Sequence, residues 1–373
     1  MRVLHVVGEM NRAGTETWLM HVLRNIDRSK IQMDFLVHTD AACDYDDEIR
    51  SLGGRIFNFP HSKNPIRYGY LLWIFLTTGS SYNVIHSHVH HFSGFVMLVA
   101  RLANVKVRIT HSHSDSKKIN KKSNFLRRGY VWLMEKFISH YSTRGLATSE
   151  IAAPSLFGDR WRDDKRWQVL YCGIDFSSFS APIEKSKVRS DLKIPQDRFV
   201  LGHVGRFSPV KNHRFLLEMF QELKQLRQDV HLLMVGTGSE LGNIRAAVVE
   251  LGLQHYVTFT GSRDDVPKLM RSAMDIFVFP SLHEGLGLVV VEAQAASLRC
   301  IVSEAITEEV AINGVTRLSL ALGPTAWAEV VNSESSLVDS AVAANVNALS
   351  KKFSIQESIA GLSRIYESDD ARN

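Results

Sequence analysis

The feature of the sequence that most constrains its fold is an alternation of short apolar runs with amphipathic stretches along nearly the whole chain. Runs such as RVLHVV (2–7) and RCIVS (299–303) are short and rich in Val, Ile and Leu, as buried strands are. One of the stretches between such runs, HRFLLEMFQELKQL (213–226), places its apolar residues at helical spacing. Alternation of this kind predicts parallel sheets covered by helices.

The pattern gives a residue range for each predicted element. The predicted strands cover residues 2–7, 32–38, 54–59, 83–88, 105–111 and 145–149 in the first half, and 199–206, 231–238, 256–261, 275–281 and 299–303 in the second. The predicted helices cover residues 15–26, 46–52, 94–103, 213–226, 243–252, 265–273 and 287–297.

A polar segment with two prolines, residues 176–197, interrupts this alternation near the middle of the chain. At 373 residues the chain is long enough for two domains. We therefore expect an α/β protein of two Rossmann-like domains, residues 1–180 and 181–345, that face each other across a cleft. A helical tail, residues 346–373, is expected to pack back on the N-terminal domain. Open α/β sheets bind ligands at the carboxyl ends of their strands, so the cleft is the expected site.

The composition excludes several classes of protein. With 45% hydrophobic and 22% charged residues the chain resembles an ordinary globular protein, and its longest apolar run, YGYLLWIFLTT, is shorter than the ~20 residues of a membrane span. The three cysteines form no CxxC pair, which favours a reducing cytoplasm. The net charge of +5 favours anionic partners, but no nucleic-acid-binding module is visible, so nucleic acid is not an expected partner.

A loop suited to phosphate follows the first strand of the second half. Gly205 and Arg206 begin a strand-to-helix turn that ends with Lys211, and such a turn directs backbone N–H groups at a bound ligand. The two cations suit a diphosphate. The alternative interpretation is a pair of solvated loop cations.

A second loop, in PSLHEGLGLVVVEA (280–293), carries two carboxylates separated by seven residues. Glu284 lies in the loop, and Glu292 lies about two helical turns later among Val and Ala. Gly285 and Gly287 let the backbone approach a ligand closely. Carboxylates accept hydrogen bonds from sugar hydroxyls, and an ionised Glu292 on so apolar a helix is costly unless a ligand or partner satisfies it.

These two motifs together resemble the retaining glycosyltransferases of family four, which have the GT-B fold. AGTE (13–16) is similar to the glycine-rich first loop of the family, and GID (173–175) is similar to its element before the interdomain linker. VGTG (235–238) is similar to a further family element, and SEAITEEV (303–310) resembles the bacterial exopolysaccharide branch. The order and spacing of the motifs extend the resemblance over nearly the whole chain.

The resemblance implies a metal-independent transfer of a hexosyl unit, with retention of configuration, from a nucleotide-diphosphate sugar to a glycan or lipid-linked saccharide acceptor in exopolysaccharide synthesis. It implies no cofactor, and it favours a UDP-sugar as the donor. Arg206 and Lys211 would hold the diphosphate, Glu284 the transferred sugar and Glu292 the ribose, while the backbone of residues 261–263 would meet the base. The donor-binding residues implied in this way are Gly14, Gly205, Gly261, Arg263, Glu284, Gly285, Leu286, Gly287 and Glu292.

The chain departs from the family pattern in two places. Cys172 stands where Asn commonly precedes the Gly-Ile-Asp element, and in EAQAASLR (292–299) Ser297 and Arg299 stand where Gly and Pro are usual. These departures concern the local turn geometry and the subfamily, because none of them is one of the charged residues.

Six histidines lie in VIHSHVHHF (84–92) and RITHSHSDS (108–116), at the ends of two predicted strands. Residues two apart on a strand face the same side, so the pairs could ligate a metal. Asp115 is the only acid in either stretch, whereas hard-metal hydrolase sites normally add several, so we expect no metal. By the resemblance, His111 would lie near the donor sugar and acceptor, with His113 as the alternative. His86, His88, His90 and His91 are interpreted as strand-end or loop residues that line the acceptor pocket at most.

A basic run without acids precedes GYVWLMEKFIS (129–139), which is rich in aromatic and aliphatic residues. Such a surface can dock on anionic lipid, and we therefore expect a cytoplasmic enzyme at the inner face of the cell membrane. The alternative is a solvated charge run beside a core helix. The cations of the run are Lys117, Lys118, Lys121, Lys122, Arg127 and Arg128.

Three rival functions remain open from the sequence. A nucleotide-sugar 2-epimerase shares the architecture, but it needs no acceptor and the Arg, Lys and paired-Glu combination disfavours it. An NAD-dependent dehydrogenase is suggested by VGTGSELG (235–242), but its glycine spacing is one residue too long and the stretch lies within a domain rather than after its first strand. A sugar-nucleotide sensor without activity is the third rival.

Overall fold

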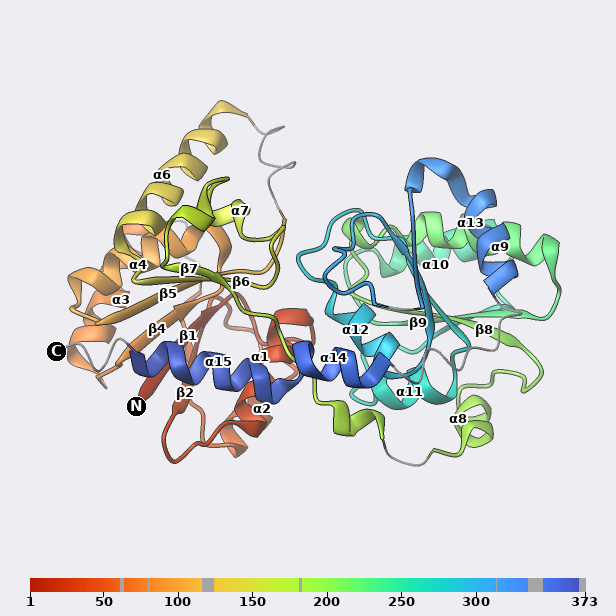
Figure 1. Ribbon diagram of the computed structural model, residues 1–373, viewed down its shortest axis with the longest axis horizontal. Coiled ribbons are helices and arrows are strands. Elements are labelled where there is room, and N and C mark those ends of the chain that lie inside the picture. Colours follow the sequence, from red (N-terminus) through yellow and green to blue (C-terminus); the bar gives the residue numbers. More distant parts are fainter. Residues whose placement is uncertain are drawn as a thin grey trace. The chain divides into compact units, whose positions relative to one another are not determined.

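The computed structural model describes residues 1–60, 64–79, 81–115, 124–180, 183–312, 314–334 and 345–368. The chain forms two compact units, one of Met1–Gly173 with Ile355–Asn373 and the other of Ile174–Ser354. Each unit contains one sheet in which all strand pairs are parallel (Figure 1). The predicted class, two parallel α/β sheets, is therefore confirmed. The domain ranges 1–180, 181–345 and 346–373 stay a prediction, and in the structure the chain passes between the units after Gly173 and again after Ser354.

The sheet of the first unit has seven strands in the order β3-β2-β1-β4-β5-β6-β7. The strands are β1 (Arg2–Val7), β2 (Gln32–Val37), β3 (Ile56–Asn58), β4 (Val84–Ser87), β5 (Val107–Ser112), β6 (Arg144–Ala147) and β7 (Trp167–Val169). The helices are α1 (Gly14–Asn25), α2 (Asp46–Ser51), α3 (Pro65–Thr78), α4 (Ser93–Leu102), α6 (Phe125–Tyr141), α7 (Pro154–Phe157) and α15 (Ile355–Ser368).

Helices cover both faces of this sheet, with α3, α4 and α6 on one side and α1, α2 and α15 on the other (Figure 1). On the first side Leu72 and Met97 pack with Leu4 and Ile85 of the strands. On the second side the indole Nε1 of Trp18 in α1 donates to Ser358 Oγ in α15 at 2.9 Å, and both residues are buried. The last described helix is thereby fixed to the first helix of the chain.

The sheet of the second unit has six strands in the order β10-β9-β8-β11-β12-β13. The strands are β8 (Phe199–Val204), β9 (Val230–Val235), β10 (Val257–Phe259), β11 (Ile276–Phe279), β12 (Arg299–Ser303) and β13 (Val315–Leu318). The helices are α8 (Lys185–Asp191), α9 (His213–Leu226), α10 (Leu241–Glu250), α11 (Val266–Ser272), α12 (Leu288–Ala295), α13 (Gly323–Glu334) and α14 (Asn345–Phe353).

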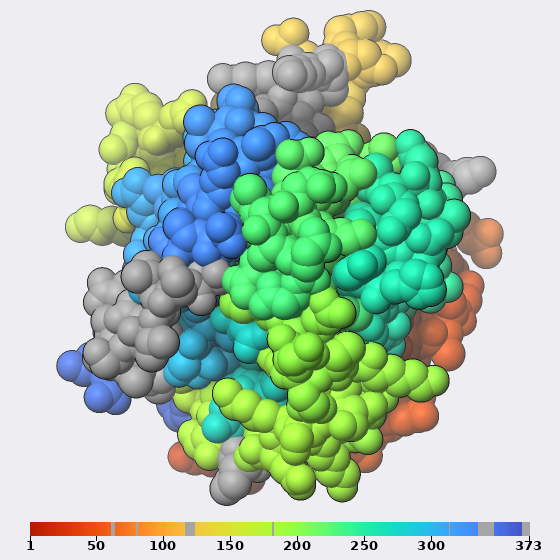
Figure 2. Space-filling view, turned by 90° about the vertical axis from the view of Figure 1, so that its right-hand side faces the viewer, coloured from red at the N-terminus to blue at the C-terminus, as the bar shows by residue number. Residues whose placement is uncertain are grey.

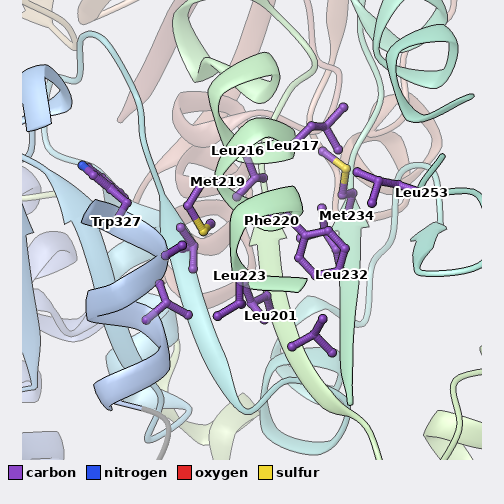
Figure 3. Close-up of a cluster of buried hydrophobic side chains, with 14 of the residues drawn as sticks. Leu201, Leu216, Leu217, Met219, Phe220, Leu223, Leu232, Met234, Leu253 and Trp327 are labelled. Atoms are coloured by element: carbon purple, nitrogen blue, oxygen red, sulfur yellow. The ribbon is translucent and has the colours of Figure 1, made fainter. Parts of the chain in front are cut away.

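The core of the second unit lies between its sheet and α9. Leu216, Phe220 and Leu223 of α9 point at Leu201 and Leu232 of the strands, and Trp327 of α13 closes one side (Figure 3). Figure 2 looks onto this unit and shows the surfaces of α9 (green), α10 (teal) and α13 (blue) beside one another. The helical period read from residues 213–226 matches α9 residue for residue, because its apolar face is buried and its polar face is exposed.

The prediction missed two strands, β7 and β13, each of which lies at one of the two edges of its sheet. Each is short and pairs on one side only, and every residue of β13 is half-buried. An edge strand of this kind needs no continuous apolar run, so WQV and VTRL carry little of the signal that identifies a central strand.

The departure at Ser297 has a structural consequence. This serine follows α12 and has φ 62°, the left-handed conformation in which helices commonly end with glycine. Leu298 N donates to Ala293 O at 3.0 Å, the hydrogen bond that closes such a helix end. A side chain in this conformation costs about 1–2 kcal/mol, which glycine avoids.

We expect Ser297→Gly to stabilise the second unit by about 0.5–1 kcal/mol, because the relief of backbone strain exceeds the added entropy of the unfolded chain. The urea-unfolding midpoint measures the effect. Ser186→Gly, at an exposed serine within α8, is the matched control and should lower the midpoint. A fall in the midpoint for both variants would contradict the strain at Ser297.

Candidate active site

The loop that carries Arg206 is held by the loop after the neighbouring strand. Gly205 N donates to Val235 O at 3.0 Å, and Phe207 N donates to Thr237 O at 2.8 Å. In return, Phe207 O accepts a hydrogen bond from Glu240 N at 2.9 Å. The backbone between β8 and α9 is therefore fixed before any side chain of the loop is considered.

The glycines of VGTG are required by this close packing. Gly236 and Gly238 have φ 137° and 155°, and a Cβ on them would lie 2.1 Å from Gly205 O and 2.3 Å from Phe207 O. No other residue type fits so close to a neighbouring backbone. The motif that suggested a dinucleotide-binding loop thus serves to support the loop of residues 205–207.

Lys211 and Glu284 are brought together although they are far apart in the sequence. Lys211 Nζ lies 2.5 Å from Glu284 Oε1, and the same oxygen accepts a hydrogen bond from Ser281 Oγ at 2.6 Å. Lys211 Nζ also lies 4.7 Å from the centroid of the Phe279 ring. The two charged residues follow β8 and β11, which are adjacent in the sheet, and both side chains are largely buried. Their pairing fixes an ammonium group at the carboxyl end of the sheet.

Glu292 has a different environment. It is the fifth residue of α12, and among the residues that the structure describes its carboxyl has no hydrogen-bond or ion-pair partner. Burial raises the pKa of Glu292 to about 7. A half-buried carboxyl without a protein partner is costly, and it is suited to a ligand that offers hydroxyl donors. Gly285, Leu286 and Gly287, just before α12, are buried.

The remaining residues of the second unit that are predicted to bind the donor lie in loops. Arg206 is exposed, one residue after Gly205. Gly261 has φ 71°, and its carbonyl accepts a hydrogen bond from Gly236 N at 2.9 Å. Arg263 forms two hydrogen bonds of 2.7 and 2.8 Å with Asp265, which lower the pKa of that carboxyl. The Arg263 charge is therefore neutralised within its own loop, which suits a role of the backbone rather than of the side chain.

Gly14, the predicted donor-binding glycine of the first unit, is the first residue of α1 and is exposed. A Cβ at this position would meet no atom within 4 Å. Packing within the protein therefore does not require glycine here, and the backbone stays open to a ligand.

The first unit places five histidines side by side at the carboxyl ends of β1, β4 and β5. His86 Nε2 lies 3.2 Å from His111 Nδ1, and His88 Nδ1 lies 2.8 Å from His113 Nε2. His5 of β1, which the sequence interpretation did not include, lies with its Nδ1 3.0 Å from His88 Nε2. His5 lies opposite His86 in the register of β1 with β4. Only this pairing of the strands relates His5 to the other histidines. His90 and His91 form a separate pair after β4.

Burial keeps all five rings neutral. Desolvation lowers the pKa of His5 and of His113 to about 3, and it lowers the pKa of His86, His88 and His111 well below the usual value. Neighbouring histidines lower the pKa of these three rings further. The network extends to Tyr366 of α15, whose Oη lies 2.9 Å from His86 Nδ1.

Two overlapping groups in this network have the spacing of metal ligands. His5, His86 and His88 form one group and His88, His111 and His113 the other, with one ligand atom of each residue within 4.8 Å of those of the other two. Neutral imidazoles suit a soft ion such as Zn²⁺, and no carboxylate joins either group among the described residues. The hydrogen bonds between the rings satisfy several of the same nitrogen atoms, so the cluster is also stable without an ion.

His111 and His113 differ in exposure. His111 is fully buried beneath Trp18, with ring centroids 5.3 Å apart, and its Nε2 has no hydrogen-bond partner among the described residues. His113 lies just after β5 and is half-buried. Of the two, His113 is the one that solvent reaches.

Comparison with known proteins places this arrangement in a family. Residues 12–178 match the family described as "Glycosyltransferase Family 4", and residues 184–347 match the one described as "Glycosyl transferases group 1". The chain is 39% identical over 338 residues to EpsF of Bacillus subtilis (strain 168), which is named as a glycosyltransferase; the match covers 88% of this chain and 86% of EpsF. The chain belongs to glycosyltransferase family 4. The predicted family is thus confirmed.

Other relatives extend the comparison. The capsular polysaccharide biosynthesis glycosyltransferase CapH of Staphylococcus aureus is 27% identical over 89% of this chain and 90% of its own length. The Escherichia coli UDP-Gal:alpha-D-GlcNAc-diphosphoundecaprenol alpha-1,3-galactosyltransferase is 27% identical over 60% of this chain and 58% of its own length.

A solved structure shares the whole fold. Anabaena HepE in complex with UDP and glucose superposes with a TM-score of 0.82 at 18% identity, over 99% of this chain and 100% of that structure. The two Rossmann-like sheets are accordingly those of the GT-B fold. No helix among the described residues of the glycosyltransferase is long and apolar enough to span a membrane.

The five neutral histidines should make the protein sensitive to mild acid. Their pKa values are lowered in the fold, so the stability they allow is complete above the unfolded pKa of 6.5 and is lost as pH falls towards about 3. Each histidine contributes a slope of about 1.4 kcal/mol per pH unit within this window. Glu292 opposes the slope, because its raised pKa favours the fold at low pH.

The unfolding free energy in urea, measured from about pH 8 to about pH 5, tests this expectation above the range in which ordinary carboxylates titrate. The slope of the unfolding free energy against pH should fall in His5→Gln by the amount that corresponds to about one bound proton, whatever the effect of the variant on stability at about pH 8. A slope that is unchanged in this variant would show that His5 is not a neutral group in the fold.

Proposed function

We propose that this glycosyltransferase moves a hexosyl unit from a UDP-sugar to a lipid-linked saccharide during the synthesis of a cell-surface polysaccharide, with retention of configuration and without a metal ion. The observation that carries the proposal is the pairing of Lys211 with Glu284, beside a Glu292 carboxyl that has no partner among the described residues. A largely buried cation paired with one carboxylate, and a second carboxylate on the helix that follows, match the two parts of such a donor, its diphosphate and its sugars.

The chemistry assigned to the cations follows from charge development. Cleavage of the bond between the sugar and the diphosphate leaves negative charge on phosphate oxygens, and we assign Lys211 and Arg206 to stabilise it. A cation held in advance costs no reorganisation in the transition state, so it is more effective than a mobile one. The ion pair with Glu284 and the contact with Phe279 hold Lys211 in this way. In this proposal Lys211 and Arg206 together replace the divalent ion that other transferases use.

The remaining roles follow from the hydrogen-bonding capacity of each group. Glu284 accepts from hydroxyls of the transferred sugar, and Glu292 accepts from the ribose. The backbone of Gly261–Arg263 meets the base, since the Arg263 side chain is paired with Asp265. His113, neutral and half-buried, is assigned to the sugar or acceptor hydroxyl, whereas His111 holds the ring network behind it. The departing phosphate helps to deprotonate the acceptor.

The names of the relatives support the choice of substrates. The E. coli relative is named for a UDP-linked donor and a diphosphoundecaprenol-linked acceptor, and CapH is named for capsular polysaccharide synthesis. HepE was solved with UDP and glucose. We assign the same donor base and acceptor class to this chain.

Calorimetric titration with UDP, GDP and ADP, each with and without EDTA, tests the donor. UDP should bind most tightly and with the same affinity in EDTA, and Arg206→Ala should weaken it at least about tenfold through loss of a charged hydrogen bond. Arg214→Ala is the control, because Arg214 forms surface ion pairs with Glu218 and Glu250 on the outside of α9 and α10. UDP binding that EDTA abolishes would contradict metal independence. It would favour a metal ion bound by the histidine groups.

Lys211→Met should lower the rate of transfer by about 10²–10³, because the variant keeps the length of the side chain and removes the charge that stabilises the departing phosphate. Hydrolysis of UDP-glucose, UDP-galactose or UDP-N-acetylglucosamine gives a readout that needs no acceptor. Lys224→Met is the matched control, since Lys224 lies 3.8 Å from the Tyr256 ring centroid on the opposite end of α9. Equal rates for Lys211→Met and the wild type would remove Lys211 from the mechanism. A rival 2-epimerase would invert the configuration at C2 of the sugar in the absence of an acceptor.

A further inference from the structure

Exposed apolar side chains gather on two helices of the first unit. Among the described residues, nine of fifteen large hydrophobic side chains that are exposed belong to α3 or α6. Scattered single residues of this kind are normal on a surface, but a concentration on two elements indicates an interaction site.

On α3 most of the exposed side chains are apolar. Tyr68, Leu72 and Leu76 point into the core, whereas Ile66, Tyr70 and Trp73 recur at helical spacing on the outside. Ile66 is 82% exposed and Tyr70 61%. The core therefore accounts for only the buried side chains of the longest apolar run, and the exposed apolar side chains of this run have another cause.

On α6 the same division recurs with basic residues added. Val131, Met134 and Ile138 are buried, while Phe125 and Trp132 are 79% and 60% exposed. The other exposed residues of this helix include Leu126, Arg127, Arg128, Tyr130, Leu133 and Lys136. Lys117, Lys118, Lys121 and Lys122 of the predicted lipid-docking run lie outside the described residues.

The two helices belong to one layer. Both pack against α4, on the side of the sheet away from α1 and α15 (Figure 1). The contacts are close: a Cβ at Gly69 of α3 would lie 2.8 Å from the Phe95 ring of α4, and one at Gly94 of α4 would lie 2.5 Å from the Met134 carbonyl oxygen of α6. The outward faces of α3 and α6 are thus held on the same side of the first unit.

The charge of these two helices is mainly positive. The described segment 64–79 contains Arg67 and no acid, and segment 124–141 contains Arg127, Arg128 and Lys136 against Glu135 alone. Two of the six tryptophans of the chain are exposed, Trp73 at 41% and Trp132 at 60%, and both lie here. Aromatic rings with an apolar body and a polar atom, flanked by cations, are typical of residues at a membrane–water interface.

We propose that the outward faces of α3 and α6 form a docking surface for an anionic lipid bilayer. The apolar side chains enter the headgroup boundary, and the cations meet the lipid phosphates. The inference deepens the proposed function, since a lipid-linked acceptor is found only at such a surface. A second copy of the chain is a poorer occupant. A two-fold contact places the same patch on both partners, which would bring these cations against each other with Glu135 as the only acid.

Vesicle sedimentation of the full chain tests the proposal. The protein should bind vesicles of phosphatidylcholine with phosphatidylglycerol, bind phosphatidylcholine alone at least about tenfold more weakly, and release at high salt. Tryptophan emission should shift to the blue on binding, because the other four tryptophans are already at most 7% exposed. Trp132→Phe should reduce this shift.

Two sets of variants separate the contributions. Ile66→Ser with Phe125→Ser and Trp132→Ser should weaken binding at least about tenfold. Arg67→Gln with Arg127→Gln and Arg128→Gln should abolish the preference for anionic vesicles. Leu226→Ser with Val249→Ser and Leu322→Ser is the control for exposed apolar residues elsewhere, and it should bind as the wild type does.

Several results would overturn the docking surface. These are equal binding to neutral and anionic vesicles, binding that the α3 and α6 variants leave unchanged, or self-association that the apolar variants abolish while vesicles are not bound. UDP titration of the same variants keeps the two proposals distinct. Intact UDP binding without vesicle binding removes only the docking surface, and absent UDP binding removes the proposed donor.

Discussion

Parallel pairing of the strands is the constraint on which the rest of the structure depends. In a parallel sheet every strand ends at the same edge, so residues that directly follow strands gather there whatever their distance in the sequence. Lys211 follows β8 and Glu284 follows β11, and these strands are neighbours in the second unit. The histidines gather in the same way at the ends of β1, β4 and β5. Helices bury the faces of such sheets, which leaves the ends of the strands as the place where loop residues gather.

Close backbone contacts make these edges rigid. Gly236 and Gly238 let one loop lie on the backbone of residues 205–207, and the Lys211–Glu284 pair joins the loops after β8 and β11. Glu292, by contrast, is left without a partner among the described residues, and its raised pKa shows the resulting cost. A site that binds a polar ligand retains such costs, because the ligand supplies the missing hydrogen bonds.

Much of the fold could be predicted because its central strands and amphipathic helices carry their own periodicity. Residues 2–7, 213–226 and 299–303 were predicted with the bounds that the structure shows. The edge strands β7 and β13 lacked that signal, since a half-buried edge needs few apolar residues. The run that forms α3 is apolar on both sides, so its composition did not distinguish the side facing the core from the side facing solvent.

The sequence by itself determined the class of fold, the order of the motifs and the loops on which the charged residues lie, because each depends on patterns a few residues long. Only the tertiary structure decided which of those residues meet. Lys211 pairs with Glu284 because β8 lies beside β11, and strand order is a property of the whole sheet. His111 lies in β5 and His113 just after it, and Trp18 of α1 contacts both rings, yet the first is fully buried and the second half-buried. Burial of this kind is set by packing between distant segments, and no local pattern records it.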